Sequence, residues 1–75
     1  MTKVLIYITP NCIYCQMAKK FFKDHHVAYE EKDVSVDGKV REEMVEKSGQ
    51  LGAPVIDIDD RIIIGFDEAA IKELL

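Results

Sequence analysis

The stretch TPNCIYCQMAKKFF, from Thr9 to Phe22, decides how the rest of the chain is interpreted. It contains both cysteines of the 75-residue sequence, Cys12 and Cys15, as a C-x-x-C motif that directly follows an apolar run. Three explanations of such a pair compete: a redox-active dithiol, half of a metal site and a structural disulfide. A disulfide across so short a loop would constrain the unfolded chain very little, which disfavours the third explanation.

The residues around this motif predict a β-strand followed by a helix. The segment KVLIYIT (residues 3–9) is nearly all apolar and rich in β-branched residues, which is typical of a central strand covered on both faces. Pro10 ends the strand, and Asn11 is a candidate N-cap for a helix that begins at Cys12. Lysines and Gln16 should face solvent, whereas the apolar residues that recur at four-residue spacing should face the core: Ile13, Met17, Phe21, Tyr14, Ala18 and Phe22.

The remaining two thirds of the chain predict two helices and three strands. Val40 and Met44 should face the core from the first of these helices, and Glu43 and Lys47 should form an ion pair one turn apart. In chain order we expect a strand over 27–34, a helix between Asp37 and Gly49, a hairpin of strands 54–58 and 61–65 turning at Asp59 and Asp60, and a helix over 67–75.

The order of the elements is β-α-β, then α, then β-β-α. A β-α-β unit makes its two strands parallel, whereas the hairpin must be antiparallel, so the sheet is mixed, with helices on both faces. We therefore predict a single α/β domain, residues 1–75, with the minimal thioredoxin-like fold of four strands flanked by three helices. In that context a C-x-x-C motif indicates redox chemistry.

Charge and hydropathy bear on the partners of the chain. The formal net charge of -4 argues against nucleic acid or an anionic membrane as the main partner, because both need a basic surface. The apolar run from Val4 to Ile8 is too short for a membrane span or a signal-peptide core, so we expect a cytoplasmic protein. Once the core is assigned, no exposed apolar stripe should remain, and we expect a monomer.

The spacing of the two cysteines gives each of them a role. A helix N-terminus provides free N–H groups and positive potential, so Cys12 is the expected nucleophile. Cys15 lies one turn later, within reach of Cys12, and is the expected resolving thiol. The metal hypothesis lacks ligands, because His25 and His26 are adjacent and are better interpreted as the C-terminal cap of the helix. A cluster shared between two chains, with Cys12 as one ligand from each, is the alternative.

Three segments along the chain resemble the glutaredoxin-like redoxins of the thioredoxin superfamily. CIYC (12–15) is similar to the C-P-Y-C motif of glutaredoxins, with Ile13 in place of proline. SGQLGAPV (48–55) resembles the segment that contains the cis-proline of that family. GFDEAAI (65–71) resembles the glycine turn that opens its last helix. The resemblance covers the whole chain.

The resemblance implies a binding site around the cysteines. Pro54 would be the cis-proline that faces them, and Ala53 would offer its backbone N–H and C=O to an extended substrate or to glutathione. Gly65, Phe66 and Asp67 would hold the γ-glutamyl end of glutathione, although Asp67 is equally an ordinary N-cap. Tyr14, between the cysteines, completes the implied substrate or glutathione site.

The resemblance leaves the electron donor open. Glutaredoxins usually have a lysine and a basic or polar residue where this chain has Thr9 and Leu51, and both would have met the glycine carboxylate of glutathione. The chain also resembles the small redoxins that reduce ribonucleotide reductase and are recharged by thioredoxin reductase. We therefore expect a dithiol oxidoreductase that reduces protein or small-molecule disulfides with either glutathione or thioredoxin reductase as donor, without a tightly bound cofactor or metal.

Overall fold

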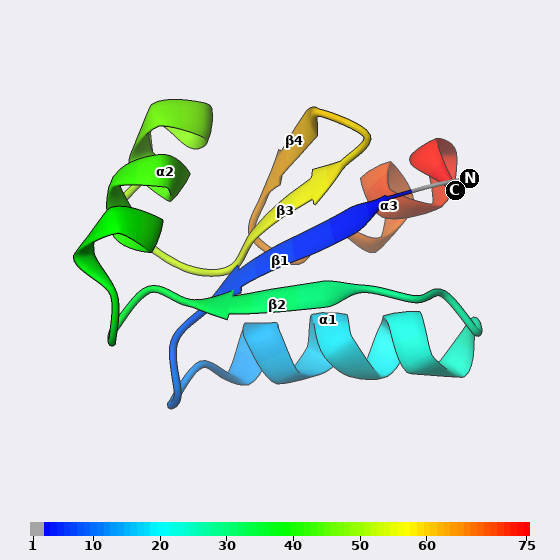
Figure 1. The fold of residues 1–75 in the computed structure, drawn as a ribbon. Helices are drawn as coiled ribbons and strands as arrows, with labels where there is room; N and C mark the ends of the chain where they lie inside the picture. Colours follow the sequence, from blue (N-terminus) through cyan, green and yellow to red (C-terminus); the bar gives the residue numbers. More distant parts are fainter. Residues whose placement is uncertain (1–2) are drawn as a thin grey trace.

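The structure, a computed structural model, describes residues 3–75, so residues 1 and 2 of the predicted 1–75 domain lie outside it. The predicted order of strands and helices is confirmed (Figure 1). The elements are β1 (Val4–Ile8), α1 (Ile13–Asp24), β2 (Glu30–Asp33), α2 (Gly38–Ser48), β3 (Val55–Ile58), β4 (Arg61–Ile64) and α3 (Glu68–Leu74).

The four strands form one mixed sheet in the order β2-β1-β3-β4. β1 pairs with β2 in parallel, as the β-α-β unit requires, and with β3 in antiparallel orientation. The hairpin of β3 and β4 turns at Asp59 and Asp60, both with positive φ, which is the backbone of a tight hairpin turn. β2 is shorter than predicted because this polar edge strand pairs with β1 only over four residues.

Side chains of β1 alternate between two hydrophobic clusters, which explains why its sequence is apolar throughout. Val4, Ile6 and Ile8 face α1 and α3, where they pack with core residues such as Phe22. Leu5 and Tyr7 face α2 together with Val34, Met44 and Val55. The sheet is therefore a central layer, with α1 and α3 on one face and α2 on the other (Figure 1).

Helix α1 begins one residue later than predicted, because Cys12, and not Asn11, is its N-cap. Its buried residues are Cys15, Ala18, Phe21 and Phe22, whereas Ile13, Tyr14 and Met17 are exposed. The prediction that these three face the core is wrong. Steps of four residues advance about 40° beyond a full turn, so a four-residue repeat drifts away from the face that packs on the sheet.

Helix α2 has the predicted caps and the predicted apolar face, but different ion pairs. Asp37 caps its N-terminus, Gly49 ends it with a φ of 70°, and Met44 is fully buried. The predicted pair of Glu43 with Lys47 is wrong, because both side chains extend from the helix to the sheet and bind partners there. Across residues 3–75, no helix has the length and apolar character needed to cross a membrane.

Candidate functional site

Cys12 lies at the mouth of α1, where β1 has ended and the first helical turn begins. Its backbone is extended, with φ -102° and ψ 111°, and its side chain is half-buried. The Cys15 backbone N–H donates to Cys12 Sγ at 3.1 Å. The sulfur thus occupies the position that a capping oxygen normally takes, facing the N–H groups that have no partner within the helix.

Cys15 is in a different environment, one turn into the helix. It is 1% exposed and packs in the cluster that contains Ala18 and Phe22. Burial, and then the hydrogen bond with Cys12, raises the pKa of Cys15 to about 12, although a backbone hydrogen bond from Thr9 and the charge of Lys19 act in the opposite direction. At neutral pH, Cys15 is therefore a protonated thiol that a large molecule in solution cannot reach.

The segment before β3 carries two further predicted site residues, Ala53 and Pro54. The bond between them is cis, as the resemblance implied. Pro54 is buried, and its carbonyl accepts from the Gly65 N–H at 2.9 Å. Ala53 packs against the same hydrophobic cluster as Cys12. Among the described residues, the backbone groups of 51–53 have no intramolecular hydrogen-bond partner.

The turn that opens α3 has a clear structural role. Gly65 has a φ of 78°, a conformation that favours glycine, and Phe66 packs edge-on against Phe21 with their ring centroids 5.9 Å apart. Asp67 is the N-cap of α3 and accepts from the Ala70 N–H at 3.1 Å. The capping interpretation of Asp67 is therefore confirmed, and its contact with glutathione stays a prediction.

Large apolar side chains are exposed on α1 and in the segment before β3. Ile13 and Tyr14 lie between the two cysteines on α1 and are 72% and 61% exposed, and Met17 follows one turn later. Leu51, 68% exposed, lies in the segment that leads to Ala53. The prediction that no exposed apolar surface remains is therefore wrong, and the monomeric state predicted from it stays a prediction.

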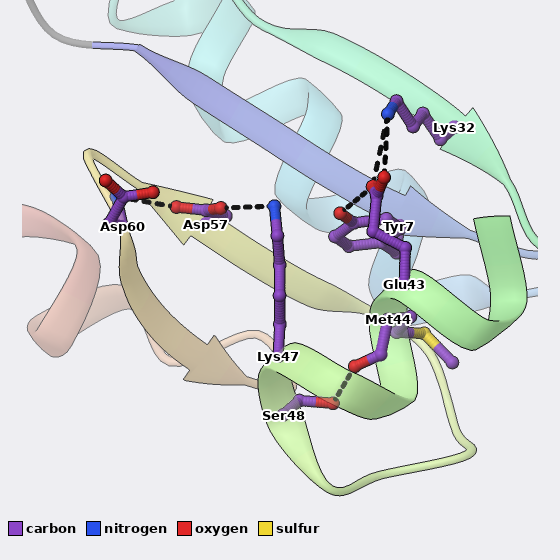
Figure 2. Close-up of polar contacts among 8 residues, drawn as sticks. All are labelled: Tyr7, Lys32, Glu43, Met44, Lys47, Ser48, Asp57 and Asp60. Atoms are coloured by element: carbon purple, nitrogen blue, oxygen red, sulfur yellow. Dashed lines mark hydrogen bonds and ion pairs between the residues drawn. The ribbon is translucent and has the colours of Figure 1, made fainter.

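Sequence reasoning missed a polar network between α2 and the sheet (Figure 2). The Tyr7 hydroxyl donates to Glu43, whose carboxylate also binds Lys32 with an Nζ–Oε2 distance of 3.1 Å. Lys47 Nζ lies 2.8 Å from Asp57 Oδ2, and Asp57 is buried. The sequence did carry one signal of this network. Asp57 is a charged residue inside the apolar strand β3, and a charged side chain in a strand that is covered on both faces needs a polar partner.

Histidine and acidic residues do not gather around the cysteines in a way that suggests a metal site. Within residues 3–75, no group of three or more His, Cys, Asp or Glu side chains is placed to hold a metal ion. His25 is the C-cap of α1, as predicted, and its Nδ1 lies 2.9 Å from the Phe21 carbonyl oxygen. His26 follows with a φ of 55°.

Comparison with known proteins relates this chain and its fold to one family. The glutaredoxin family model matches residues 4–63. A glutaredoxin-like 8.6 kDa protein in a rubredoxin operon of Clostridium pasteurianum is 42% identical over 72 residues, which cover 96% of both chains. The glutaredoxin-like protein NrdH of Lactococcus lactis is 32% identical, covering 95% of this chain and 97% of that one.

Solved structures agree with the sequence comparison. The crystal structure of a glutaredoxin from Archaeoglobus fulgidus superposes with a TM-score of 0.88 at 29% sequence identity, over 99% of this chain and 86% of that one. The predicted thioredoxin-like fold is thus confirmed, and with it the resemblance on which the site prediction rests. The chain belongs to the glutaredoxin family, whose chemistry is thiol–disulfide exchange.

Proposed function

We propose that the protein is a dithiol oxidoreductase that reduces disulfides with Cys12 as nucleophile and Cys15 as resolving thiol. The observation that carries this proposal is the difference between the two sulfurs. Cys12 is partly exposed at the N-cap of α1 and accepts a backbone hydrogen bond, whereas Cys15 is buried and protonated directly behind it. The family does not favour the alternative, a metal-binding or iron–sulfur module that uses Cys12.

The reaction has two exchange steps. The Cys12 thiolate attacks one sulfur of the substrate disulfide, forms a mixed disulfide and releases the other substrate sulfur as a thiolate. Cys15 then loses its proton and attacks Cys12 Sγ, which forms the Cys12–Cys15 disulfide and releases the second substrate thiol. Two electrons pass from the protein to the substrate, and an external thiol donor must return them.

The segment before β3 is the proposed contact for the substrate backbone. The Ala53 N–H and C=O have no hydrogen-bond partner within residues 3–75, so an extended peptide that carries a disulfide can pair with them as an added strand. Pro54 holds this segment next to β3, and Tyr14 and Phe66 would flank the bound chain. In this proposal the exposed Ile13, Met17 and Leu51 contact apolar side chains of the protein substrate.

The electron donor is proposed to be either glutathione or thioredoxin reductase. The turn of Gly65, Phe66 and Asp67 is the candidate contact for the γ-glutamyl end of glutathione. The other end of glutathione is a carboxylate, and the exposed Leu51 offers it no charge. This observation favours thioredoxin reductase as donor. In this proposal the protein acts in the cytoplasm as a monomer.

An NADPH-oxidation assay with a small disulfide substrate separates the two donors. One reaction contains glutathione and glutathione reductase, the other contains thioredoxin reductase alone, and Cys12→Ser is the control in both. We expect turnover with thioredoxin reductase and none in the control. Turnover only with glutathione would assign Asp67 and Ala53 to a glutathione site, and turnover by Cys12→Ser would contradict the proposed mechanism.

A further inference from the structure

We propose that Lys47 and Asp57 are positioning residues that clamp the two ends of the segment carrying Ala53 and Pro54. Lys47 lies in the last turn of α2, and Asp57 lies in β3. They are ten residues apart in sequence, and their ion pair closes a loop whose irregular part is residues 49–54. This inference rests on the proposed function, because it concerns the substrate contact of Ala53.

The ion pair joins a buried carboxylate to a partly exposed lysine, since the Lys47 side chain is 33% exposed. The Asp57 side chain is 8% exposed and uses both carboxylate oxygens, since Oδ2 binds Lys47 Nζ and Oδ1 accepts from the Asp60 N–H at 2.8 Å. Lys47 Nζ also lies 5.4 Å from the ring centroid of the fully buried Tyr7 in β1. Figure 2 shows Lys47 reaching from α2 across to Asp57. Such a geometry fixes where the end of the helix sits over the sheet.

The clamped segment is held mainly at its ends. The Gly49 N–H donates to Val45 O at 2.8 Å, and the Gln50 N–H donates to Ser48 Oγ at 3.1 Å, so both hydrogen bonds at this end are made to α2. The other end joins the sheet, where the Pro54 carbonyl accepts from Gly65. The backbone groups of residues 51–53 have no partner among the described residues. Ala53 itself packs against the same hydrophobic cluster as Cys12, and the path by which the chain reaches Ala53 from the helix depends on where α2 ends.

Lys47 can act as a clamp because α2 makes few apolar contacts with the sheet. Met44 is the only residue of the helix that is buried, and half-buried Val40 adds a second apolar contact. Polar contacts add to the attachment: Tyr7 and Lys32 bind Glu43 near the middle of α2, and Lys47 binds Asp57 at its end. Only the pair of Lys47 with Asp57 lies next to the segment that contains Ala53.

The test compares Lys47→Met with Lys32→Met, which removes the other ion pair between α2 and the sheet. Each variant is assayed with a disulfide-linked peptide, whose backbone pairs with Ala53 in the proposed function, and with 5,5′-dithiobis(2-nitrobenzoate), which has no peptide backbone to pair. In Lys47→Met we expect KM for the peptide to rise about tenfold, the effect of one lost hydrogen-bonded contact, with little change in kcat. The reaction with the small disulfide should be unchanged, and Lys47→Arg should restore the peptide KM.

Hydrogen exchange provides a readout that does not depend on activity. The amides of Gly49 and of the last turn of α2 should exchange faster in Lys47→Met than in Lys32→Met. If Lys47→Met does not fold, the double variant Lys47→Met/Asp57→Leu removes both charges and leaves no unpaired carboxylate in the interior, and the same measurements apply to it.

The outcomes separate this inference from the proposed function. The clamp would be overturned if Lys47→Met changed neither the KM for the peptide nor the hydrogen exchange of the Gly49 amide. It would also be overturned if Lys32→Met changed both quantities as much as Lys47→Met does. Failure of the wild-type protein to react with either disulfide would instead overturn the proposed function, while the exchange measurement would still report on the clamp. Faster Gly49 exchange together with a raised peptide KM in Lys47→Met alone would support it.

Discussion

At the residue scale, the proposed thiol–disulfide exchange depends on two cysteines that lie in different surroundings. Cys12 caps α1 and is partly open to solvent, whereas Cys15 is 1% exposed, three residues later. Burial is the largest cause of the raised pKa of Cys15. This effect of burial does not depend on the Cys12 side chain. The asymmetry between the proposed nucleophile and the proposed resolving thiol is therefore a property of the fold.

This asymmetry predicts the alkylation rates of the two thiols. At pH 7, iodoacetamide should modify Cys12 in Cys15→Ser roughly a hundredfold faster than it modifies Cys15 in Cys12→Ser, because Cys15 is buried and has little thiolate at this pH. Mass spectrometry of quenched samples measures both rates. Equal rates in the two folded variants would contradict the assignment of Cys12 as the accessible sulfur.

Some residues of the candidate site could be predicted from sequence and others could not. The C-x-x-C spacing at the start of a helix was sufficient to propose Cys12 and Cys15 as the redox pair, and the structure places both sulfurs at the start of α1. The exposure of Ile13 and Met17 was not predicted, because it depends on which side of α1 meets the sheet. The partners of Lys47 and Glu43 were assigned along the helix, whereas the structure places them on strands that lie far away in sequence.

At the element scale, α2 depends on its caps because it buries few apolar side chains. Asp37 Oδ1 accepts from the Lys39 N–H at 2.9 Å. We predict that Asp37→Ala lowers the free energy of unfolding by about 1 kcal/mol, measured by urea denaturation, because this N–H loses its partner. Glu42→Ala, an exposed position on the same helix, is the control and should change stability by less than about 0.5 kcal/mol.

The contact of α2 with β1 also predicts an acid dependence of stability. A hydrogen bond from Tyr7, and then one from Lys32, lowers the pKa of Glu43 below its ordinary value of 4.5. A lowered folded-state pKa stabilises the fold above pH 4.5, and this stability is lost as the pH falls through the folded-state value. The stability difference between the wild type and Tyr7→Phe should therefore shrink as the pH falls below 4.5. A constant difference across this range in urea titrations would contradict the contribution of Glu43.

At the scale of the whole molecule, the β-α-β unit and the terminal hairpin largely determine where the site forms. β1 leads to Cys12 and pairs with β3, so the end of β1 and the start of β3 bring Cys12 and Ala53 to the same hydrophobic cluster. The order of the elements predicted the mixed sheet, whereas the placement of Ala53 beside Cys12 was implied only by the resemblance to glutaredoxin-like redoxins. The docking of α2 could not be predicted, because it uses polar side chains whose partners are set only when the sheet has formed.

Burial of Cys15 predicts how the stability of the reduced protein changes at alkaline pH. The folded-state pKa of about 12 exceeds the ordinary value of 9.0, so the buried neutral thiol stabilises the fold fully below pH 9. That stability is lost as the pH rises from about 9 toward 12. Urea denaturation of the reduced protein between pH 8 and pH 11 should show a steeper loss in the wild type than in Cys15→Ala. Parallel curves would contradict the burial of a titrating thiol.

The central claim is that Cys12 attacks the substrate and Cys15 completes the reaction. The most direct test is to mix each single-cysteine variant with a disulfide-linked peptide and to record the intact mass with time. Cys15→Ser should accumulate a one-to-one mixed disulfide that only an added thiol releases, and Cys12→Ser should form none and show no turnover. Turnover by Cys12→Ser, or a mixed disulfide that forms at Cys15 as fast as at Cys12, would contradict the account.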